Sequence, residues 1–370
     1  MTTTLTNLGD VMRPRVIIDP EFRTMDEVFR PDDLGRLGDV AEIVWGKDEP
    51  MPTDLFRSEI AQASAVVFGR WRYGRDALDH AGPRLRAVLE VAGGHEHEAL
   101  DDQSATRRGI LVGSCAPAFG AVVAELGLGL ALGMRRGIVE ADRAMRARSE
   151  RWLHEGNRHN GSLFGATVGF VGCGRISAHL QKLLAPFGVK LCGYDPPLGA
   201  KQLQARGIAP ATLEEMFAQA DIIFVLAAPS ASAAAMISRH LIGQLGPHQG
   251  LVVLSRASVV DFEALVELSQ VNGFRFATDV YPSEPIGAND PLRDNEQAIL
   301  VPHLAGAIPE ALQQIGTMVV DDLLDIFAGR PVGKLQYLTA KNRAGLVQIT
   351  KNSCGKKGRE MPQHAAQPTY

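Results

Sequence analysis

Three polar residues in the later part of the chain carry side chains suited to acid–base chemistry on a small anion. Arg256, Glu284 and His303 each stand a few residues after a short apolar segment. Arginine binds a carboxylate through two parallel hydrogen bonds, histidine exchanges a proton near neutral pH, and a carboxylate can orient an imidazole ring. Each residue alone is also typical of a solvated strand end or a turn. The three indicate a site only if the fold brings them together.

A glycine-rich stretch in the middle of the chain predicts a strand, a turn and a helix that could lie beside such a site. Residues 167–171 suit a buried parallel strand, and Gly172 and Gly174 follow at once, before an amphipathic helical segment over 178–184. A second apolar strand over 189–194 leads to Asp195. This order predicts a Rossmann-type dinucleotide-binding unit, in which the glycines let the backbone approach a pyrophosphate. An ordinary strand-to-helix turn is the alternative.

Two details of this stretch bear on the cofactor. Ser177 stands where the motif expects its third glycine, and serine is small enough for that packing position. Asp195 is at the position where an acid accepts hydrogen bonds from the adenosine ribose and repels a 2′-phosphate. Residues 196–198 offer no arginine for that phosphate. The sequence therefore predicts NAD (NADH) in preference to NADP.

Apolar strand segments alternate with helical segments, which is typical of parallel sheets covered by helices. Strands are expected at residues 16–19, 41–45, 65–69, 85–91, 109–112, 167–171, 189–194, 221–227, 251–255, 275–279 and 299–301. One long helix is expected over 118–148 and another over 309–328. The fold class is α/β, with two doubly wound parallel-sheet domains. Residues 341–370 are polar and basic, and we expect a disordered tail there.

Composition argues against several classes of function. The net charge of −4 and the lack of a basic helix with interleaved aromatic residues give no footprint for nucleic acid. The longest apolar stretch, 121–134, contains Glu125 and is too short to span a bilayer, so no membrane partner is expected. The four cysteines have no paired spacing, and no secretory signal is visible. We expect free thiols and a cytoplasmic protein.

The ordered set of motifs resembles the D-isomer-specific 2-hydroxyacid dehydrogenase family. The likeness rests on Arg256, Glu284 and His303 in their settings, on residues 108–110 and 123–125, and on the glycine-rich unit, and it covers roughly residues 16–330. It implies a Rossmann-type NAD domain over 118–303, inserted into a flavodoxin-like substrate domain formed by 14–117 and 304–340. It also implies a homodimer built on the cofactor domain, with the helix around 121–134 at or near the interface.

The resemblance implies a role for each site residue. Arg256 would bind the carboxylate of a 2-oxo acid, and His303 would act as the general acid and base. Glu284 would hold one ring nitrogen of the histidine and favour its protonated form. The cofactor-binding residues would be Gly172, Gly174, Arg175, Ile176, Asp195 and Asp279, of which Asp279 would help place the nicotinamide.

The predicted substrate turn of the first domain departs from the family pattern. Gly93 and Gly94 could donate backbone N–H groups to the substrate, but His95, Glu96, His97 and Glu98 follow them. A metal site there is less favoured than a solvated loop, because no further ligand occurs at suitable spacing. Trp71 could form a wall of the substrate cleft or pack in the core. The serine–alanine run 229–235 replaces a threonine-containing turn near the cofactor.

Three functions stay open on the sequence. The first is an NAD-dependent enzyme that interconverts a small 2-oxo acid, such as glyoxylate or hydroxypyruvate, and its D-2-hydroxy acid. The second is a regulatory protein that uses the same fold to sense NAD(H), as related transcriptional corepressors do. The third is a dehydrogenase for another small acid such as phosphite. Glu284 argues against formate, because formate dehydrogenases of the superfamily pair the histidine with glutamine. The identity of the acid rests on loops that a sequence does not place.

Overall fold

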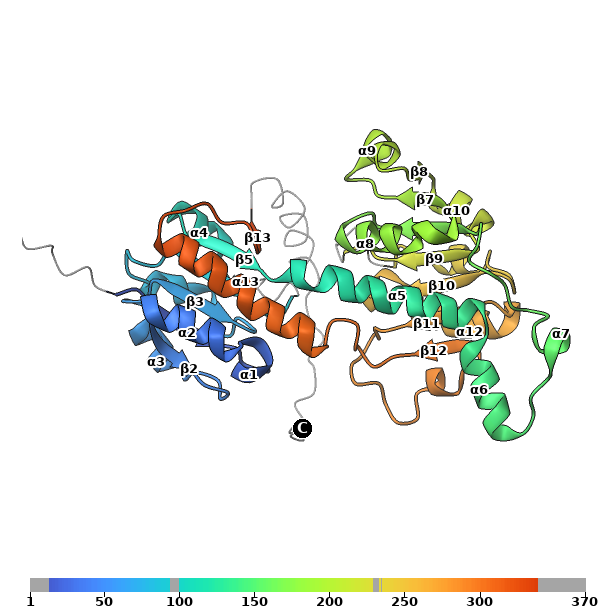
Figure 1. The fold of residues 1–370 in the computed structure, drawn as a ribbon, viewed down its shortest axis with the longest axis horizontal. Helices are drawn as coiled ribbons and strands as arrows, with labels where there is room; N and C mark the ends of the chain where they lie inside the picture. The colour runs from blue at the N-terminus through green and yellow to red at the C-terminus, as the bar shows by residue number, and fades with distance from the viewer. Residues whose placement is uncertain (1–12, 94–99, 229–232, 234, 339–370) are drawn as a thin grey trace, which may run out of the picture.

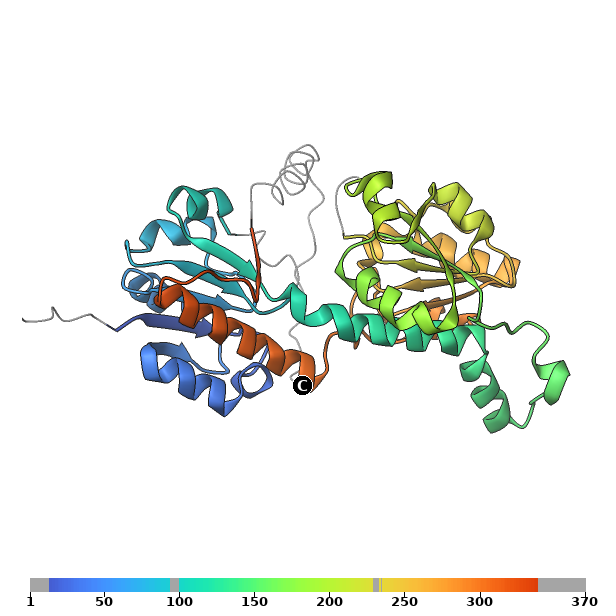
Figure 2. The ribbon, with the colours of Figure 1, turned by 45° about the horizontal axis from the view of Figure 1, so that its top comes forward.

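The computed structural model describes residues 13–93, 100–228, 233 and 235–338. In this part of the chain the strands form two separate sheets, each covered by helices (Figures 1 and 2). The two sheets stand side by side, and the chain passes between them along helix α5 (Gly120–Arg135) and again before helix α13 (Pro309–Phe327). The α/β fold class expected from the alternation of strands and helices is confirmed.

The first sheet has the strand order β13-β5-β4-β3-β1-β2. Its strands are β1 (Arg15–Asp19), β2 (Glu42–Gly46), β3 (Ala65–Phe68), β4 (Ala87–Glu90), β5 (Leu111–Ser114) and β13 (Gln336–Tyr337). All neighbours are parallel except β13, which runs antiparallel to β5. The covering helices include α1 (Met25–Val28), α2 (Pro31–Val40), α3 (Thr53–Glu59), α4 (Asp102–Arg107) and α13. Because α13 and β13 come from the end of the described chain, the second domain is an insertion in the first.

The second sheet is parallel throughout and has the order β12-β11-β10-β9-β6-β7-β8. Its strands are β6 (Thr167–Val171), β7 (Lys190–Tyr194), β8 (Ala209–Pro210), β9 (Ile222–Val225), β10 (Gly250–Val253), β11 (Arg275–Thr278) and β12 (Ala298–Leu300). The helices are α8 (Arg175–Leu184), α9 (Gly199–Ala205), α10 (Leu213–Gln219), α11 (Arg239–Ile242) and α12 (Phe262–Asn272), with α5 packed against α8, β10 and β11. Central strands such as β9 are buried along their whole length, which explains their unbroken apolar sequence.

The single helix expected over 118–148 is wrong. It divides into α5 and α6 (Ile138–Ala147), because Gly137 lies in the left-handed region at φ +60° and breaks the hydrogen-bond ladder. A short helix, α7 (Leu153–Gly156), follows, and α6 and α7 project from the body of the second domain (Figure 1). The segment Ala116–Arg135 is long and apolar enough to cross a membrane, but half of its most apolar window is buried inside the protein.

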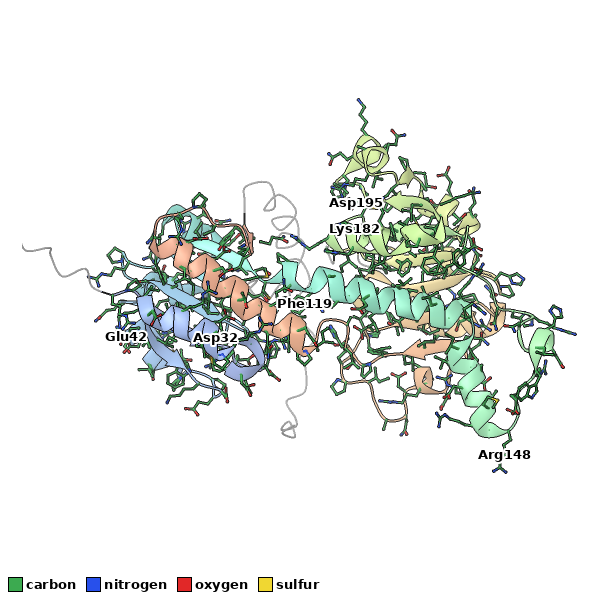
Figure 3. All side chains as sticks on the ribbon, viewed as in Figure 1. Asp32, Glu42, Phe119, Arg148, Lys182 and Asp195 are labelled. Carbon is green, nitrogen blue, oxygen red and sulfur yellow. The ribbon has the colours of Figure 1, made fainter. Side chains whose placement is uncertain are left out.

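Phe119 lies at the joint between the two domains (Figure 3). Its ring packs against Gly93 of the first domain and against Gly306 in the second connection. A Cβ atom built on Gly93 would lie 1.9 Å from Cε2 of the ring, and one on Gly306 would lie 2.6 Å from Cδ1. Both positions therefore require glycine for this close approach.

Candidate active site

The carboxyl ends of five neighbouring strands of the second sheet are in register. Leu300, Thr278 and Val253 pair in one row, which Val225 and Val171 continue. The residues that follow these strands therefore emerge at one edge of the sheet, where parallel α/β sheets bind their ligands. The loops after β12, β11, β10 and β6 carry, in that order, His303, Glu284, Arg256 and the glycine turn.

His303 and Glu284 form a hydrogen-bonded pair at this edge. Nδ1 of His303 lies 2.6 Å from Oε2 of Glu284. The other carboxylate oxygen, Oε1, accepts a hydrogen bond of 2.9 Å from the backbone N–H of Tyr281, so the carboxylate has a fixed orientation. Because Nδ1 faces the carboxylate, the Nε2 atom is the ring nitrogen left for a ligand. The side chains are 44% and 35% exposed, so the pair is open to solvent.

The backbone of His303 is in the left-handed region, with φ +53°. A non-glycine residue seldom adopts this conformation unless its surroundings impose it. Asp279 imposes it by accepting hydrogen bonds from the N–H groups of Leu304 (2.7 Å) and Ala305 (3.0 Å). The Asp279 side chain lies in the interior, and burial raises its pKa, although these two N–H groups act in the opposite direction. Asp279 therefore holds the loop that presents His303.

Tyr281 connects the two loops and was not singled out from the sequence. Its hydroxyl group donates a hydrogen bond of 2.9 Å to the carbonyl of Val301, two residues before His303. Burial is the main cause that raises the pKa of Tyr281 to about 12. No sequence pattern marks it, because a tyrosine after a strand is common.

Arg256 follows β10, two strands away from β12 in the sheet. Its side chain is exposed and forms no hydrogen bond or ion pair with any residue that the structure describes. The preceding Ser255 has a buried hydroxyl oxygen without a partner in the same described part of the chain. An uncommitted guanidinium and a buried, unpaired hydroxyl at a strand end are suited to a polar ligand.

The glycine turn has the shape that a dinucleotide requires. Gly172 has φ +91°, and a Cβ atom there would lie 2.6 Å from the backbone nitrogen of Ala227, two residues after the neighbouring strand β9. A Cβ atom on Gly174 would meet nothing within 4 Å, so the space beside this glycine, at the N-terminus of α8, is open. A helix N-terminus with open space in front of it suits a pyrophosphate.

Ser177, in place of the third glycine, is almost fully buried. Its hydroxyl donates a hydrogen bond of 2.8 Å to the carbonyl of Gly174, which satisfies the polar group. Arg175 and Ile176 form the first turn of α8. Nη2 of Arg175 lies 3.5 Å from Oε1 of Gln336 in the first domain. Arg175 therefore connects the glycine turn to the other side of the joint.

Asp195 lies beside the glycine turn, where Figure 3 labels it, and one further charged residue joins it there. Oδ2 of Asp195 accepts a hydrogen bond of 2.8 Å from the N–H of Cys173. Nη1 of Arg206 donates one of 2.9 Å to the carbonyl of the same cysteine. The sequence motifs did not point to Arg206, because it follows a separate helix, α9, and no motif fixes its position.

The structure does not place Trp71 in the cleft. The indole is 3% exposed, donates a hydrogen bond to the carbonyl of Gly74, and packs edge-on against Phe56, Phe68 and Tyr73. This favours core packing over a cleft wall. Gly93 lies at the joint beside Phe119, whereas Gly94, residues 95–98 and 229–232 lie outside the described residues. Within the described chain no cluster of three or more histidine, cysteine or acidic residues could hold a metal ion.

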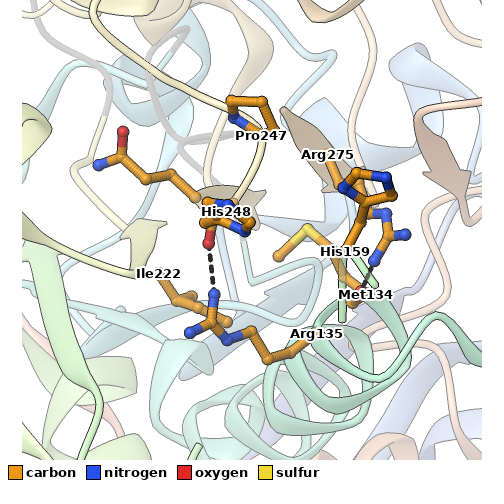
Figure 4. A pocket seen from close by; sticks show the side chains of 9 residues that line it. Met134, Arg135, His159, Ile222, Pro247, His248 and Arg275 are labelled. Atoms are coloured by element: carbon orange, nitrogen blue, oxygen red, sulfur yellow. Dashed lines mark hydrogen bonds between the residues drawn. The ribbon is translucent and has the colours of Figure 1, made fainter. Parts of the chain in front are cut away.

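A small hollow lies at the opposite edge of the second sheet (Figure 4). It is lined by Met134, Arg135, His159, Ile222, Pro247, His248, Gln249, Gly250 and Arg275. Ile222, Gly250 and Arg275 begin strands, so this hollow is at the amino ends and away from His303. Arginine hydrogen bonds to the carbonyls of Met134 and His248 hold it together. It is separate from the candidate active site.

Comparison with known proteins bears on the family to which the chain belongs. A family model described as "D-isomer specific 2-hydroxyacid dehydrogenase, NAD binding domain" matches residues 128–305. The crystal structure of a phosphoglycerate oxidoreductase from Rhizobium etli is 30% identical, with a TM-score of 0.77, and the match covers 88% of this chain and 99% of that one. The chain belongs to the D-isomer-specific 2-hydroxyacid dehydrogenase family. Its Rossmann-type domain inserted in a flavodoxin-like domain is the arrangement expected from the sequence.

Other similar proteins of the 2-hydroxyacid dehydrogenase family are named for different substrates. A D-3-phosphoglycerate dehydrogenase of Mycobacterium leprae is 30% identical over 298 residues, which are 80% of this chain and 55% of that protein. The chain thus spans about half the length of that relative. An NADPH-dependent glyoxylate/hydroxypyruvate reductase of Sinorhizobium meliloti, solved with NADP and malonate, is 25% identical, with a TM-score of 0.67 over 90% of this chain and 98% of that one.

Proposed function

We propose that this dehydrogenase family member is an NAD-dependent oxidoreductase that interconverts a small 2-oxo acid and its D-2-hydroxy acid. The observation that carries the proposal is the His303–Glu284 pair, 2.6 Å apart, at the sheet edge that also bears the glycine turn. A histidine oriented by a carboxylate is a proton donor and acceptor of the kind that this reaction needs. We further propose that the protein works in the cytoplasm.

In the reducing direction, protonated His303 donates the proton on Nε2 to the carbonyl oxygen of the 2-oxo acid. Glu284 faces Nδ1 and stabilises the positive charge of the ring before the transfer. In the oxidising direction, the neutral ring takes the hydroxyl proton back through the same nitrogen. The hydrogen bond from Tyr281 to Glu284 keeps the carboxylate in line with the ring through both steps.

Arg256 binds the substrate carboxylate in this proposal. Its guanidinium is exposed and uncommitted among the described residues, and it emerges from the same sheet edge as His303. A bidentate contact to the carboxylate fixes the rotation of the substrate, so that one face of the carbonyl is presented.

Gly172, Gly174, Arg175 and Ile176 would hold the pyrophosphate part of the cofactor at the N-terminus of α8, and Asp195 would accept hydrogen bonds from the ribose and favour NAD. The nicotinamide cofactor, when bound, supplies the hydride chemistry at the carbonyl carbon. Asp279 would fix the loop that carries His303 beside the nicotinamide position.

The test is the oxidation of NADH, followed by its absorbance, with glyoxylate, hydroxypyruvate, pyruvate, oxaloacetate and a branched 2-oxo acid as separate substrates. We expect turnover with at least one acid, and the acid that gives the highest kcat/KM identifies the substrate class. If NADH binds but no acid is reduced, the proposal fails and the regulatory alternative is favoured. Phosphite with NAD in the opposite direction tests the remaining alternative.

A further inference from the structure

Two opposite charges flank one residue of the glycine turn. The carboxylate of Asp195 binds the N–H of Cys173 at 2.8 Å, and the guanidinium of Arg206 binds the carbonyl of the same residue at 2.9 Å. Burial, followed by the charge of Asp195, raises the pKa of the Cys173 thiol to about 12, while the charge of Arg206 acts to lower it. Both charges therefore act at short range on the same point of the turn.

Both oxygens of Asp195 are already engaged with the backbone. Oδ1 accepts a hydrogen bond of 3.1 Å from the N–H of Leu198, in addition to the contact of Oδ2 with Cys173. Hydrogen bonds from two N–H groups offset part of the charge of a carboxylate. The repulsion that this acid exerts on a 2′-phosphate is therefore weaker than that of an isolated aspartate.

Arg206 is fixed in place but retains donor capacity. It follows α9, and its own carbonyl accepts a hydrogen bond of 2.6 Å from Nε2 of Gln181 on α8, which anchors the backbone. In the described chain its side chain donates to the Cys173 carbonyl and forms no ion pair with a carboxylate. The residue is exposed, so Nη2 and Nε can donate to an incoming anion.

We propose that Arg206 is a cofactor-specificity residue that binds the 2′-phosphate of NADP(H), so that the protein accepts NADPH beside NADH. This inference rests on the proposed function, because it requires a nicotinamide dinucleotide in the glycine turn. A guanidinium binds a phosphate through two hydrogen bonds and carries its charge at any physiological pH. Asp195 still favours NADH over NADPH, and Arg206 reduces the difference between the affinities for the two cofactors.

The experiment measures the dissociation constants of NADH and NADPH by nicotinamide fluorescence, without substrate, for the full chain. We expect the wild-type constant for NADPH to lie within about tenfold of that for NADH. Arg206→Gln should raise the constant for NADPH about tenfold and that for NADH less than twofold. Arg206→Lys should retain part of the NADPH affinity, because it keeps the positive charge.

The matched control is Lys201→Gln, which removes the same charge from an exposed position on α9, five residues before Arg206. It should leave both constants within twofold of wild type. Far-UV circular dichroism and the unfolding temperature establish whether each variant is folded. If Arg206→Gln does not fold, the dissociation constants of Arg206→Lys are compared with those of the wild type instead.

The possible results of the binding measurements lead to different conclusions. If Arg206→Gln weakens NADH and NADPH equally, Arg206 only supports the glycine turn and the inference is wrong. Tight NADH binding by the wild-type protein together with NADPH binding more than a hundredfold weaker would also overturn it. If neither dinucleotide binds, the proposed function itself fails.

Discussion

Asp279 is the residue on which the geometry of His303 most depends. Its two carboxylate oxygens accept the N–H groups of Leu304 and Ala305, directly after a histidine whose backbone is in the left-handed region. Asparagine has the same shape but only one acceptor oxygen, and its NH₂ group would face one of the two donors. The aspartate is thus required for its charge and its second oxygen as well as for its size.

We predict that Asp279→Asn destabilises the protein by about 1–3 kcal/mol, because one buried N–H loses its acceptor. The kcat with the best 2-oxo acid should fall at least tenfold, because the loop no longer fixes the imidazole. Chemical unfolding and steady-state kinetics measure the two effects. Asp294→Asn, an exposed residue of the same domain, is the control and should change neither quantity. Wild-type kcat in Asp279→Asn would show that the loop is held by other contacts.

The contact between His303 and Glu284 was predictable because both residues follow strands of one parallel sheet, and the carboxyl ends of such strands meet. Arg206 could not be predicted, because its approach to Cys173 depends on how the end of α9 lies against the glycine turn. Trp71 follows a strand as well, but it lies among Phe56, Phe68 and Tyr73 and is buried. A position directly after a strand predicts that the residue lies at the carboxyl edge of the sheet. The direction in which its side chain points depends on packing.

At the scale of elements, the turn between β6 and α8 contains two glycines with different physical roles. Gly172 needs its positive φ and its close approach to the backbone of Ala227, which are requirements of the fold. A Cβ atom on Gly174 would have no neighbouring atom within 4 Å, so the requirement for glycine there comes from a ligand. Substitution of Gly172 should therefore lower stability, whereas substitution of Gly174 should weaken cofactor binding.

We predict that Gly172→Ala lowers stability by about 2–4 kcal/mol, since the new methyl group meets backbone atoms in a left-handed conformation. Gly174→Ala should leave the unfolding temperature within a few degrees of wild type and raise the dissociation constant of NADH at least tenfold. Thermal unfolding and fluorescence titration compare the two variants directly. Equal NADH affinity in Gly174→Ala and wild type would place the pyrophosphate elsewhere.

The boundaries of elements were predicted less well than their existence. The strand expected at 109–112 is observed at Leu111–Ser114, two residues later. The two-residue strands β8 and β13 have too few residues to show a periodic pattern, and only pairing with β7 and β5 defines them. The break at Gly137 could have been suspected from the glycine, but α5 itself contains four glycines that remain helical.

At the scale of the molecule, α6 and α7 form an arm that leaves apolar side chains uncovered. Ile138, Met145, Trp152 and Leu153 are 52–84% exposed, on a segment that projects from the second domain (Figure 1). Such a concentration of apolar surface on a projecting segment is typical of a contact between subunits. We propose that a second copy of the chain covers it in a homodimer built on the cofactor domain.

Trp152→Ser combined with Leu153→Ser should convert a dimer into a monomer, or raise the dimer dissociation constant at least a hundredfold, because both side chains would lose their buried contact. Sedimentation velocity measures the change. Val271→Ser is the control, because Val271 is 73% exposed but belongs to α12 and not to the arm. A wild-type protein that sediments as a monomer at micromolar concentration contradicts the proposal.

The two-domain plan was the part of the fold most completely anticipated, because alternating strands and helices predict helix-covered parallel sheets and the family resemblance implies the insertion of one domain in the other. What no sequence pattern gives is the joint, where Phe119 lies against Gly93 and Gly306. These two glycines belong to the predicted substrate turn and to the connection just after His303. A movement at Phe119 would therefore alter the distance between the two halves of the site.

We propose above that His303, oriented by Glu284, transfers a proton to a 2-oxo acid. The most direct measurement is kcat for NADH oxidation with the best acid of the panel, in wild type and in His303→Ala, with NADH affinity measured alongside. We predict that kcat falls at least a hundredfold while the NADH dissociation constant stays within threefold. Turnover in His303→Ala at the wild-type rate would contradict the account.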